Sequence, residues 1–318
     1  MGEVAGPRRG PRRNKQWRTV SHGLQVPRDD VTATSDLVAW QLALPDDGCF
    51  THLTAAGLLG WWLPPLPVDL PVFACQPAGP YPRRNGLHVR RHPVRVPWTA
   101  VDGLRVAEPA EVLLACARDL GLLDVVVLVD AALHLGSCSP DDVAEAGSPT
   151  RRRAGAPLLR RALDLSDRRS ESAWESLLRV LHVVCDVPVE PQHELYDDQG
   201  RFVARGDLWL RGTRVFHEYD GGDHLQRPRQ RKDLRRGRGM TNAAWLRRGY
   251  TAEDVLYQGV GILRDADLTL GRAHRPERIR AWHGLLAASL FTPSGTARLL
   301  GKLRVPPAGR SAHERNAG

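Results

Sequence analysis

Asp207, Glu218 and Asp220 stand in the stretch RGDLWLRGTRVFHEYDGGDH, where their spacing could bind a metal ion. Asp207 opens one apolar run, and Glu218 and Asp220 close the next run on alternate positions. Since alternate residues of a strand share a face, Glu218 and Asp220 point the same way. Carboxylates gathered in one place repel each other unless a positive charge lies among them. A divalent cation that prefers oxygen ligands, Mg²⁺ or Mn²⁺, would supply that charge.

A β-hairpin is the element that must bring these acids together. The apolar runs 208–210 and 215–216 flank Gly212, a pattern that predicts two strands joined by a turn. Asp207 on the first strand would then lie across from the two acids of the second strand.

Helical spacing predicts the elements on either side of this hairpin. Apolar residues in 170–184 recur at helical spacing and predict a helix that carries Glu175. After the hairpin we expect a basic helix over about 229–242, a strand over 244–248 and a short helix from Ala252.

This order resembles the PD-(D/E)XK nuclease superfamily and, within it, the small endonuclease domains related to very-short-patch-repair (Vsr) enzymes. The resemblance covers about residues 168–260 and implies a restriction-endonuclease-like αβββαβ core that hydrolyses DNA phosphodiester bonds. It rests on the motifs Ser172-x-x-Glu175-Ser176-x-x-Arg179, Gly206-Asp207, Glu218-Tyr219-Asp220-Gly221-x-x-His224, Asp233-x-x-Arg236 and the segment 245–254.

The resemblance also implies a role for each candidate residue. Asp207 and Glu218 would be the metal ligands, and Asp220 occupies the position where most of the superfamily carries Lys. His224 fits the place of a histidine in the Vsr-like branch, where it would act as general acid or base, or as a metal ligand. Glu175 would be an extra acid that orients the metal-bound water.

The chain is basic, with 45 Lys and Arg against 36 Asp and Glu and a formal net charge of +9. Nine basic residues and a single acid, Asp233, lie between Arg227 and Arg248. This run directly follows the acids, where a bound polyanion would have to lie. We therefore predict DNA contacts from Arg229, Arg231, Lys232, Arg235, Arg236 and Arg238; the alternative is a solvated basic helix.

The length of 318 residues suits two domains. We expect a disordered basic tail over 1–30, a smaller mixed α+β domain over 31–165, the nuclease-like domain over 166–292 and a disordered tail over 304–318. Within 31–165 we expect a short strand over 94–96 and a helix over 151–163.

The 31–165 segment resembles the AbiEi-like domain of type IV antitoxins and abortive-infection proteins. The motifs that carry the likeness are Thr51-His52-x-Thr54-Ala55-Ala56-x-x-x-Gly60, Gly103-Leu104-x-Val106 and Asp130-Ala131-Ala132-Leu133. The resemblance admits a toxin or another defence-system protein as a partner, beside DNA.

The cysteine pattern and the hydropathy of the chain indicate the cellular compartment in which we expect the protein. Five scattered cysteines without a CxxC pair argue against structural zinc and against a disulfide scaffold. The apolar segment 122–135 is short and contains Asp124 and Asp130, so it predicts a core helix rather than a membrane span. The basic N-terminus lacks the apolar region of a signal peptide, and we expect a soluble, cytoplasmic protein.

Three functions remain open from the sequence. The first is a metal-dependent DNA endonuclease, in phage defence or DNA repair, which uses the acids and the basic run together. The second is a DNA-binding transcriptional regulator or antitoxin-like protein whose nuclease fold is inactive, a hypothesis that the missing Lys favours. The third, a small-molecule enzyme or a scaffold, lacks a Gly-rich phosphate loop or a nucleophile motif to support it. Taken singly, Asp207, Glu175, Asp220 and His224 are also common as cap, helix, turn and surface residues.

Overall fold

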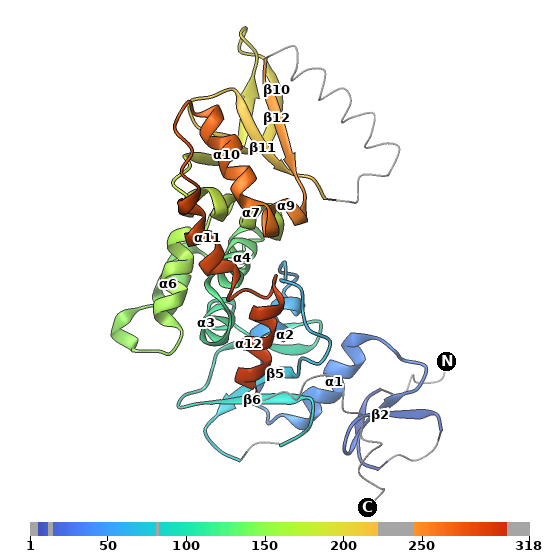
Figure 1. Cartoon of the computed structure of the whole chain (residues 1–318). Helices are drawn as coiled ribbons and strands as arrows, with labels where there is room; N and C mark the ends of the chain where they lie inside the picture. The colour runs from blue at the N-terminus through green and yellow to red at the C-terminus, as the bar shows by residue number, and fades with distance from the viewer. Residues whose placement is uncertain (1–5, 12–14, 81–82, 222–243, 304–318) are drawn as a thin grey trace, which may run out of the picture.

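The computed structural model describes residues 6–11, 15–80, 83–221 and 244–303. Within these residues, helices and three sheets of mixed order make up an α+β protein, which confirms the fold class predicted from the sequence (Figure 1). No helix of the described residues is long and apolar enough to cross a bilayer.

A small sheet lies at the N-terminus and packs on the first helix. Its strand order is β1-β3-β2, and the elements are β1 (Arg8–Arg9), β2 (Trp17–Ser21), β3 (Leu24–Pro27) and α1 (Ala33–Ala43). The expectation of a disordered tail over 1–30 was therefore wrong for this stretch. Gly23, at φ +68°, closes a tight turn between β2 and β3, and Leu24 and Val26 are fully buried in the core.

A five-stranded sheet of order β6-β5-β4-β8-β7 follows. Its strands are β4 (Cys49–Phe50), β5 (Val72–Pro77), β6 (Leu87–His92), β7 (Trp98–Val101) and β8 (Leu104–Ala107). Cys49 and Cys75 pair directly across β4 and β5, with 3.4 Å between their sulfur atoms. The strand expected over 94–96 is a loop instead, because Pro93 and Pro97 flank it and cannot donate to a strand ladder.

Helices cover this sheet and lead into the C-terminal half. They are α2 (His52–Leu58), α3 (Pro109–Asp119), α4 (Leu122–His134), α5 (Pro140–Ala146), the 3₁₀ turn η1 (Pro149–Arg151) and α6 (Ala156–Leu165). The predicted core helix is confirmed, since every residue of α4 but the last is buried. The helix expected over 151–163 begins only at Ala156, because Arg152 (φ +44°) and Gly155 (φ +86°) are left-handed.

The C-terminal half is built on a four-stranded sheet of order β12-β11-β10-β9. Its elements are α7 (Ala173–Val184), β9 (Val189–Tyr196), β10 (Phe202–Leu210), β11 (Val215–Tyr219), β12 (Leu246–Tyr250) and α9 (Ala252–Tyr257). β9, β10 and β11 are antiparallel, and β12 runs parallel to β11. The expected basic helix lies in 222–243, outside the described residues.

The outer half of the β9–β10 hairpin curls back over β11. Leu195 and Ala204 pack with Phe216 in a second, small core, and the indole of Trp245 donates to the carbonyl of Tyr196 at 2.8 Å. A side chain at Gly206 would put a Cβ 2.9 Å from the Phe216 ring, so the close passage requires glycine there.

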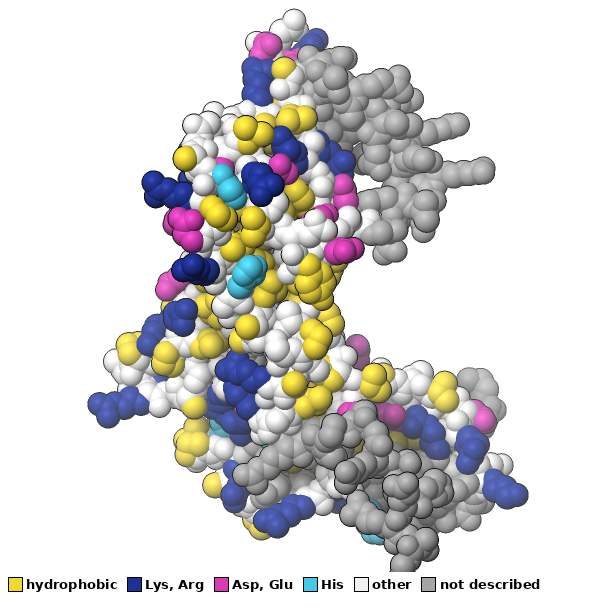
Figure 2. Space-filling model, viewed as in Figure 1, with side chains coloured by type: hydrophobic (Ala, Val, Ile, Leu, Met, Phe, Trp, Pro, Cys, Tyr) yellow, Lys and Arg dark blue, Asp and Glu magenta, His cyan; other side chains and the backbone are white. Residues whose placement is uncertain are grey.

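The two halves share one hydrophobic core at the narrow middle of the molecule, where Figure 2 shows apolar side chains gathered. There α4 packs against α7, and the buried carboxylate of Asp130 accepts from Arg179 at 2.7 Å and from Ser176 at 2.6 Å. Arg179, a residue of the nuclease-like motif, is thus a structural partner of α4. The packing crosses the predicted boundary at residue 165, and the division into two domains stays a prediction.

The last helices return to the N-terminal half. They are α10 (Gly259–Thr269), the 3₁₀ turn η2 (Pro276–Arg278), α11 (Ile279–Leu286) and α12 (Pro293–Leu303). Asp124, at the start of α4, accepts from the hydroxyl of Ser289 at 2.5 Å and from the backbone N–H of Leu290 at 3.0 Å. Lys302 of α12 donates to the carbonyl of Asp119 at the end of α3 at 2.8 Å.

Candidate active site

The hairpin of β10 and β11 brings the predicted acids to neighbouring strands. Leu208 pairs with His217, and Asp207 and Glu218 are the neighbouring residues on the two strands. One oxygen of Asp207 lies 3.4 Å from the backbone N–H of Tyr219. Glu218 is buried and Asp220, directly after β11, is partly exposed. The predicted hairpin is therefore confirmed, and it aligns these acids at one end of the sheet.

A cation from the next strand lies between two of these acids. The guanidinium of Arg247, on β12, forms ion pairs with both Glu218 and Asp220. Burial lowers the pKa of Arg247, but hydrogen bonds to the two carboxylates outweigh it and the pKa is raised overall. The positive charge that three neighbouring acids require is thus supplied, at least in part, by the chain itself.

Gly249 makes room for this arrangement. It pairs with Glu218 across β11 and β12, and a Cβ at this position would lie 1.7 Å from an oxygen of Asp220. No side chain can occupy that space, so the Asp220 carboxylate can lie against the backbone of β12. From there it reaches Arg247, two residues earlier on the same strand.

The other face of the sheet is covered by α7. The ring of Trp174 stacks on Tyr219 with centroids 5.1 Å apart, and His182 lies 2.9 Å from His217, nitrogen to nitrogen. Both histidines are fully buried. Because His217 faces α7, its neighbour Glu218 points to the opposite side of the sheet. Glu218 and its partner Arg247 therefore lie on the face away from α7.

Glu175 begins α7 and is held by hydrogen bonds at that helix end. Its carboxylate accepts from the Ser172 hydroxyl and the Glu171 backbone N–H, each at 2.9 Å. It also accepts from the amide of Gln192 on β9 at 2.8 Å. Burial raises the pKa of Glu175. The contacts described for Glu175 lead to Gln192 rather than directly to the other acids.

Gln192 connects Glu175 to the strand that carries Asp207. It lies between the pairs Pro191–Leu208 and His193–Gly206, which places it across from Asp207. Its φ of +53° is left-handed, a conformation that side-chain-bearing residues adopt at a cost of about 1–3 kcal/mol. Such backbone strain tends to occur at functional sites, and here it marks the bend of the hairpin beside Asp207.

Other predicted site residues lie outside the described residues. They are the candidate acid or base His224 and the predicted DNA contacts Arg229, Arg231, Lys232, Arg235, Arg236 and Arg238. Among the described residues, no three His, Cys, Asp or Glu side chains are grouped closely enough to hold a metal ion. The carboxylates of Asp207 and Glu218 nevertheless have the oxygen chemistry that Mg²⁺ and Mn²⁺ prefer.

Arg247, Gly249 and Gln192 are the residues that the motifs did not single out. Arg247 belongs to the basic run of the sequence. Its ion pairs with Glu218 and Asp220 depend on the parallel pairing of β12 with β11, which the sequence alone does not reveal. The comparisons with family models, curated proteins and solved structures find no match to this chain. Both family resemblances therefore remain predictions.

Proposed function

We propose that this chain is a metal-dependent endonuclease that hydrolyses DNA phosphodiester bonds, in phage defence or in DNA repair. The observation that carries the proposal is that an oxygen of Asp207 on β10 lies 3.4 Å from the backbone nitrogen of Tyr219, next to Glu218, which pairs with a cation from β12. The order α7, β9, β10, β11 and later β12 supports it, because it agrees with the αβββαβ order that the resemblance to PD-(D/E)XK nucleases implies, apart from the helix expected in 229–242, which lies outside the described residues.

Asp207 and Glu218 are the proposed ligands of Mg²⁺ or Mn²⁺. The bound ion would supply a polarised water and positive charge beside the phosphate. Asp220 is proposed to act differently from these two ligands. It occupies the position where most of the superfamily carries Lys, and it pairs with the guanidinium of Arg247. A guanidinium can donate two parallel hydrogen bonds to phosphate oxygens, which suits Arg247 to the charge that develops during the reaction.

In the proposed reaction, the water oxygen forms a bond to phosphorus and releases a proton to solvent, while the bond from phosphorus to the leaving oxygen breaks. The leaving oxygen takes up a proton, for which His224 is the proposed donor. Glu175 accepts a hydrogen bond from Gln192 and so helps to position Asp207, which lies across from Gln192 on the neighbouring strand. The basic run from Arg229 to Arg238 is proposed to hold the DNA backbone next to the acids.

A second candidate function is a DNA-binding regulator or antitoxin-like protein with an inactive nuclease fold. The ion pairs of Arg247 favour it, because they offset the charge of Glu218 and Asp220 without any metal. In that case Arg247 would be a substitute for the metal rather than a partner of it. DNA binding that weakens with salt is expected of both candidates and does not separate them.

Cleavage of supercoiled and single-stranded DNA by the full chain tests the proposal, with Mg²⁺, Mn²⁺ or EDTA. The variants Asp207→Asn and Glu218→Gln keep the side-chain shape and remove the charge. Glu253→Gln, an exposed acid in the first turn of α9, is the matched control. We expect metal-dependent nicking that the first two substitutions abolish and the control retains.

Calorimetric titration with Mn²⁺ gives a second readout that does not depend on finding the right DNA. Binding of Mn²⁺ that Asp207→Asn and Glu218→Gln both remove would support the metal site. DNA binding without cleavage and without Mn²⁺ binding would instead favour the regulator.

A further inference from the structure

A cavity of about 560 Å³ lies in the N-terminal half, among elements that carry none of the predicted acids. Three segments line it: the end of β6 with the loop 93–97, one side of α3, and residues 151–153, which comprise the last residue of η1 and the two that follow. Its volume falls within the range of about 300–1,000 Å³ that is typical of small-molecule sites.

The lining of this cavity, which we call the arginine pocket, is strongly basic. Five arginines face a single carboxylate, Glu111. Two of the five are in ion pairs, since Arg153 contacts Glu111 at both guanidinium nitrogens and Arg151 contacts Glu145. The arginines of the pocket are Arg95, Arg118, Arg151, Arg152 and Arg153.

The other three arginines have no carboxylate partner within ion-pair distance among the described residues. Arg95 and Arg152 are exposed at the rim, whereas Arg118 on α3 is partly buried and its Nε donates to the carbonyl of Ala154 at 3.2 Å. Burial lowers the pKa of Arg118, and the nearby cations Arg90 and Arg153 lower it further. A cation in such surroundings gains free energy when an anion binds beside it.

The rim also contains a left-handed residue and exposed apolar surface. Arg152 has a φ of +44°, and this backbone strain needs support from its surroundings or from a ligand. Val94 is 70% exposed and lies in the wall that Pro93, Val96 and Pro97 continue. The pocket therefore joins unpaired positive charge to an apolar wall, which suits a ligand with several negative charges at one end and a flat, weakly polar group at the other.

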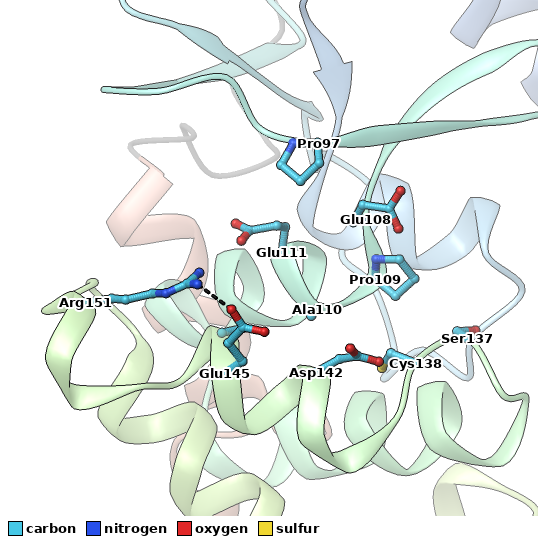
Figure 3. A pocket seen from close by; sticks show the side chains of 11 residues that line it. Pro97, Glu108, Pro109, Ala110, Glu111, Ser137, Cys138, Asp142, Glu145 and Arg151 are labelled. Carbon is cyan, nitrogen blue, oxygen red and sulfur yellow. Dashed lines mark hydrogen bonds and ion pairs between the residues drawn. The ribbon is translucent and has the colours of Figure 1, made fainter.

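An acidic cavity of about 320 Å³ adjoins the arginine pocket and shares Pro97, Glu111 and Arg151 with it. Figure 3 shows Arg151 reaching from its loop to Glu145, with Glu111 on the neighbouring helix α3. The carboxylates of Glu108, Asp142 and Glu145 line this side. They repel phosphate and can accept hydrogen bonds from N–H groups, so they favour a ligand whose phosphates point away from this side.

We propose that the arginine pocket binds a free nucleoside di- or triphosphate. Its phosphates lie against Arg95, Arg118 and Arg152, whose three charges match the charge of a diphosphate. The base lies along the wall of Val94 and Pro97, with its N–H groups toward the acidic cavity. This site is independent of the proposed nuclease chemistry.

Isothermal titration of the full chain with ADP tests this proposal at near-physiological salt. ATP and GTP are the triphosphate probes, and adenosine, which lacks phosphate, is the matched ligand control. The variant Arg95→Gln/Arg152→Gln changes two exposed side chains and spares the partly buried Arg118. Arg161→Gln, on the exposed surface of α6, is the control for lost positive charge.

ADP is expected to bind, pyrophosphate to compete with it, and adenosine to show no binding. Each lost arginine is expected to weaken ADP binding by about tenfold, the effect of one charge-assisted hydrogen bond, whereas Arg161→Gln leaves it unchanged. ADP binding that the double variant does not weaken would overturn the proposal. Pocket-dependent binding of a 5′-phosphorylated oligonucleotide, with none of free nucleotides, would overturn it too and assign the pocket to the DNA surface.

Discussion

At the scale of single residues, Arg247 supplies positive charge to the sheet face that carries Glu218 and Asp220. A buried carboxylate such as Glu218 is stable only with a partner of opposite charge or with hydrogen-bond donors. Arg247 provides the charge from a strand that lies nearly thirty residues away in sequence. The same guanidinium is available either to a scissile phosphate or, in an inactive protein, to the acids alone.

Arg247→Gln is expected to destabilise the fold by about 1–3 kcal/mol, because it removes the ion pairs that the guanidinium makes with buried Glu218 and with Asp220. If the acids bind a metal, Mn²⁺ should recover the loss, since the ion replaces the missing charge. Urea unfolding with Mn²⁺ or EDTA measures both effects. Arg214→Gln, whose partner Asp198 is exposed, is the control that should unfold like the parent. A loss that Mn²⁺ fails to recover would weigh against a metal at these acids.

Gly249→Ala is expected to displace the Asp220 carboxylate, because the new Cβ would overlap one of its oxygens. The pair between Asp220 and Arg247 should then open, and any cleavage or Mn²⁺ binding should fall. Gly261→Ala in α10 is the matched control, since nothing lies within 4 Å of a Cβ there, and it should be neutral or stabilise the helix by about 0.5–1 kcal/mol. Equal behaviour of the two variants would refute the packing argument.

At the scale of elements, local patterns in the sequence predict what is local in the fold. The turn at Gly212 and the helical spacing around Glu175 predict the hairpin and α7, and both are confirmed. The sequence does not reveal the curl of β9 and β10 over Phe216, because it depends on a left-handed Gln192 and on contacts with Trp245. The parallel pairing that carries Arg247 to Glu218 is equally non-local.

The covered face of the same sheet gives the protein a predicted pH dependence. Burial lowers the pKa of His182 to about 4 and holds that of His217 well below its usual range. Folded His182 therefore stays neutral while the unfolded chain takes up a proton below about pH 6.5. The stability that depends on a neutral, buried His182 is fully present above that pH and is lost as the pH falls toward 4.

From about pH 7 to about pH 5, His182 alone should reduce the free energy of unfolding by roughly 2 kcal/mol. His182→Gln should lessen this dependence, although it also lowers stability at neutral pH. His283→Gln, an exposed histidine at the end of α11, should leave the dependence unchanged. Urea unfolding at the two pH values makes the comparison, and an unaltered slope in His182→Gln would contradict the assignment.

At the scale of the whole molecule, α4 and α7 join the halves through a buried ion pair. Arg179→Met should cost about 3–5 kcal/mol, because Asp130 would remain buried as an uncompensated charge. Arg169→Gln removes partly exposed pairs with Asp167 and Glu190 and should cost little. Thermal unfolding followed by fluorescence and by circular dichroism measures the losses. Similar melting temperatures for the two variants would show that the pair does not hold the halves together.

Contacts between the segment 289–302 and helices α3 and α4 affect how the protein can fold. Asp124 finds its partners 165 and 166 residues later, at Ser289 and Leu290, and Lys302 closes on the end of α3 across 183 residues. During synthesis, the N-terminal half leaves the ribosome long before these partners exist. Contacts of such separation slow folding, and until α11 and the segment after it are made, the Asp124 carboxylate has the local donor Gly121 but lacks the donors Ser289 and Leu290. Synthesis of the segment from Ser289 to Lys302, rather than completion of the N-terminal half, is then the step that lets α3 and α4 reach their native contacts.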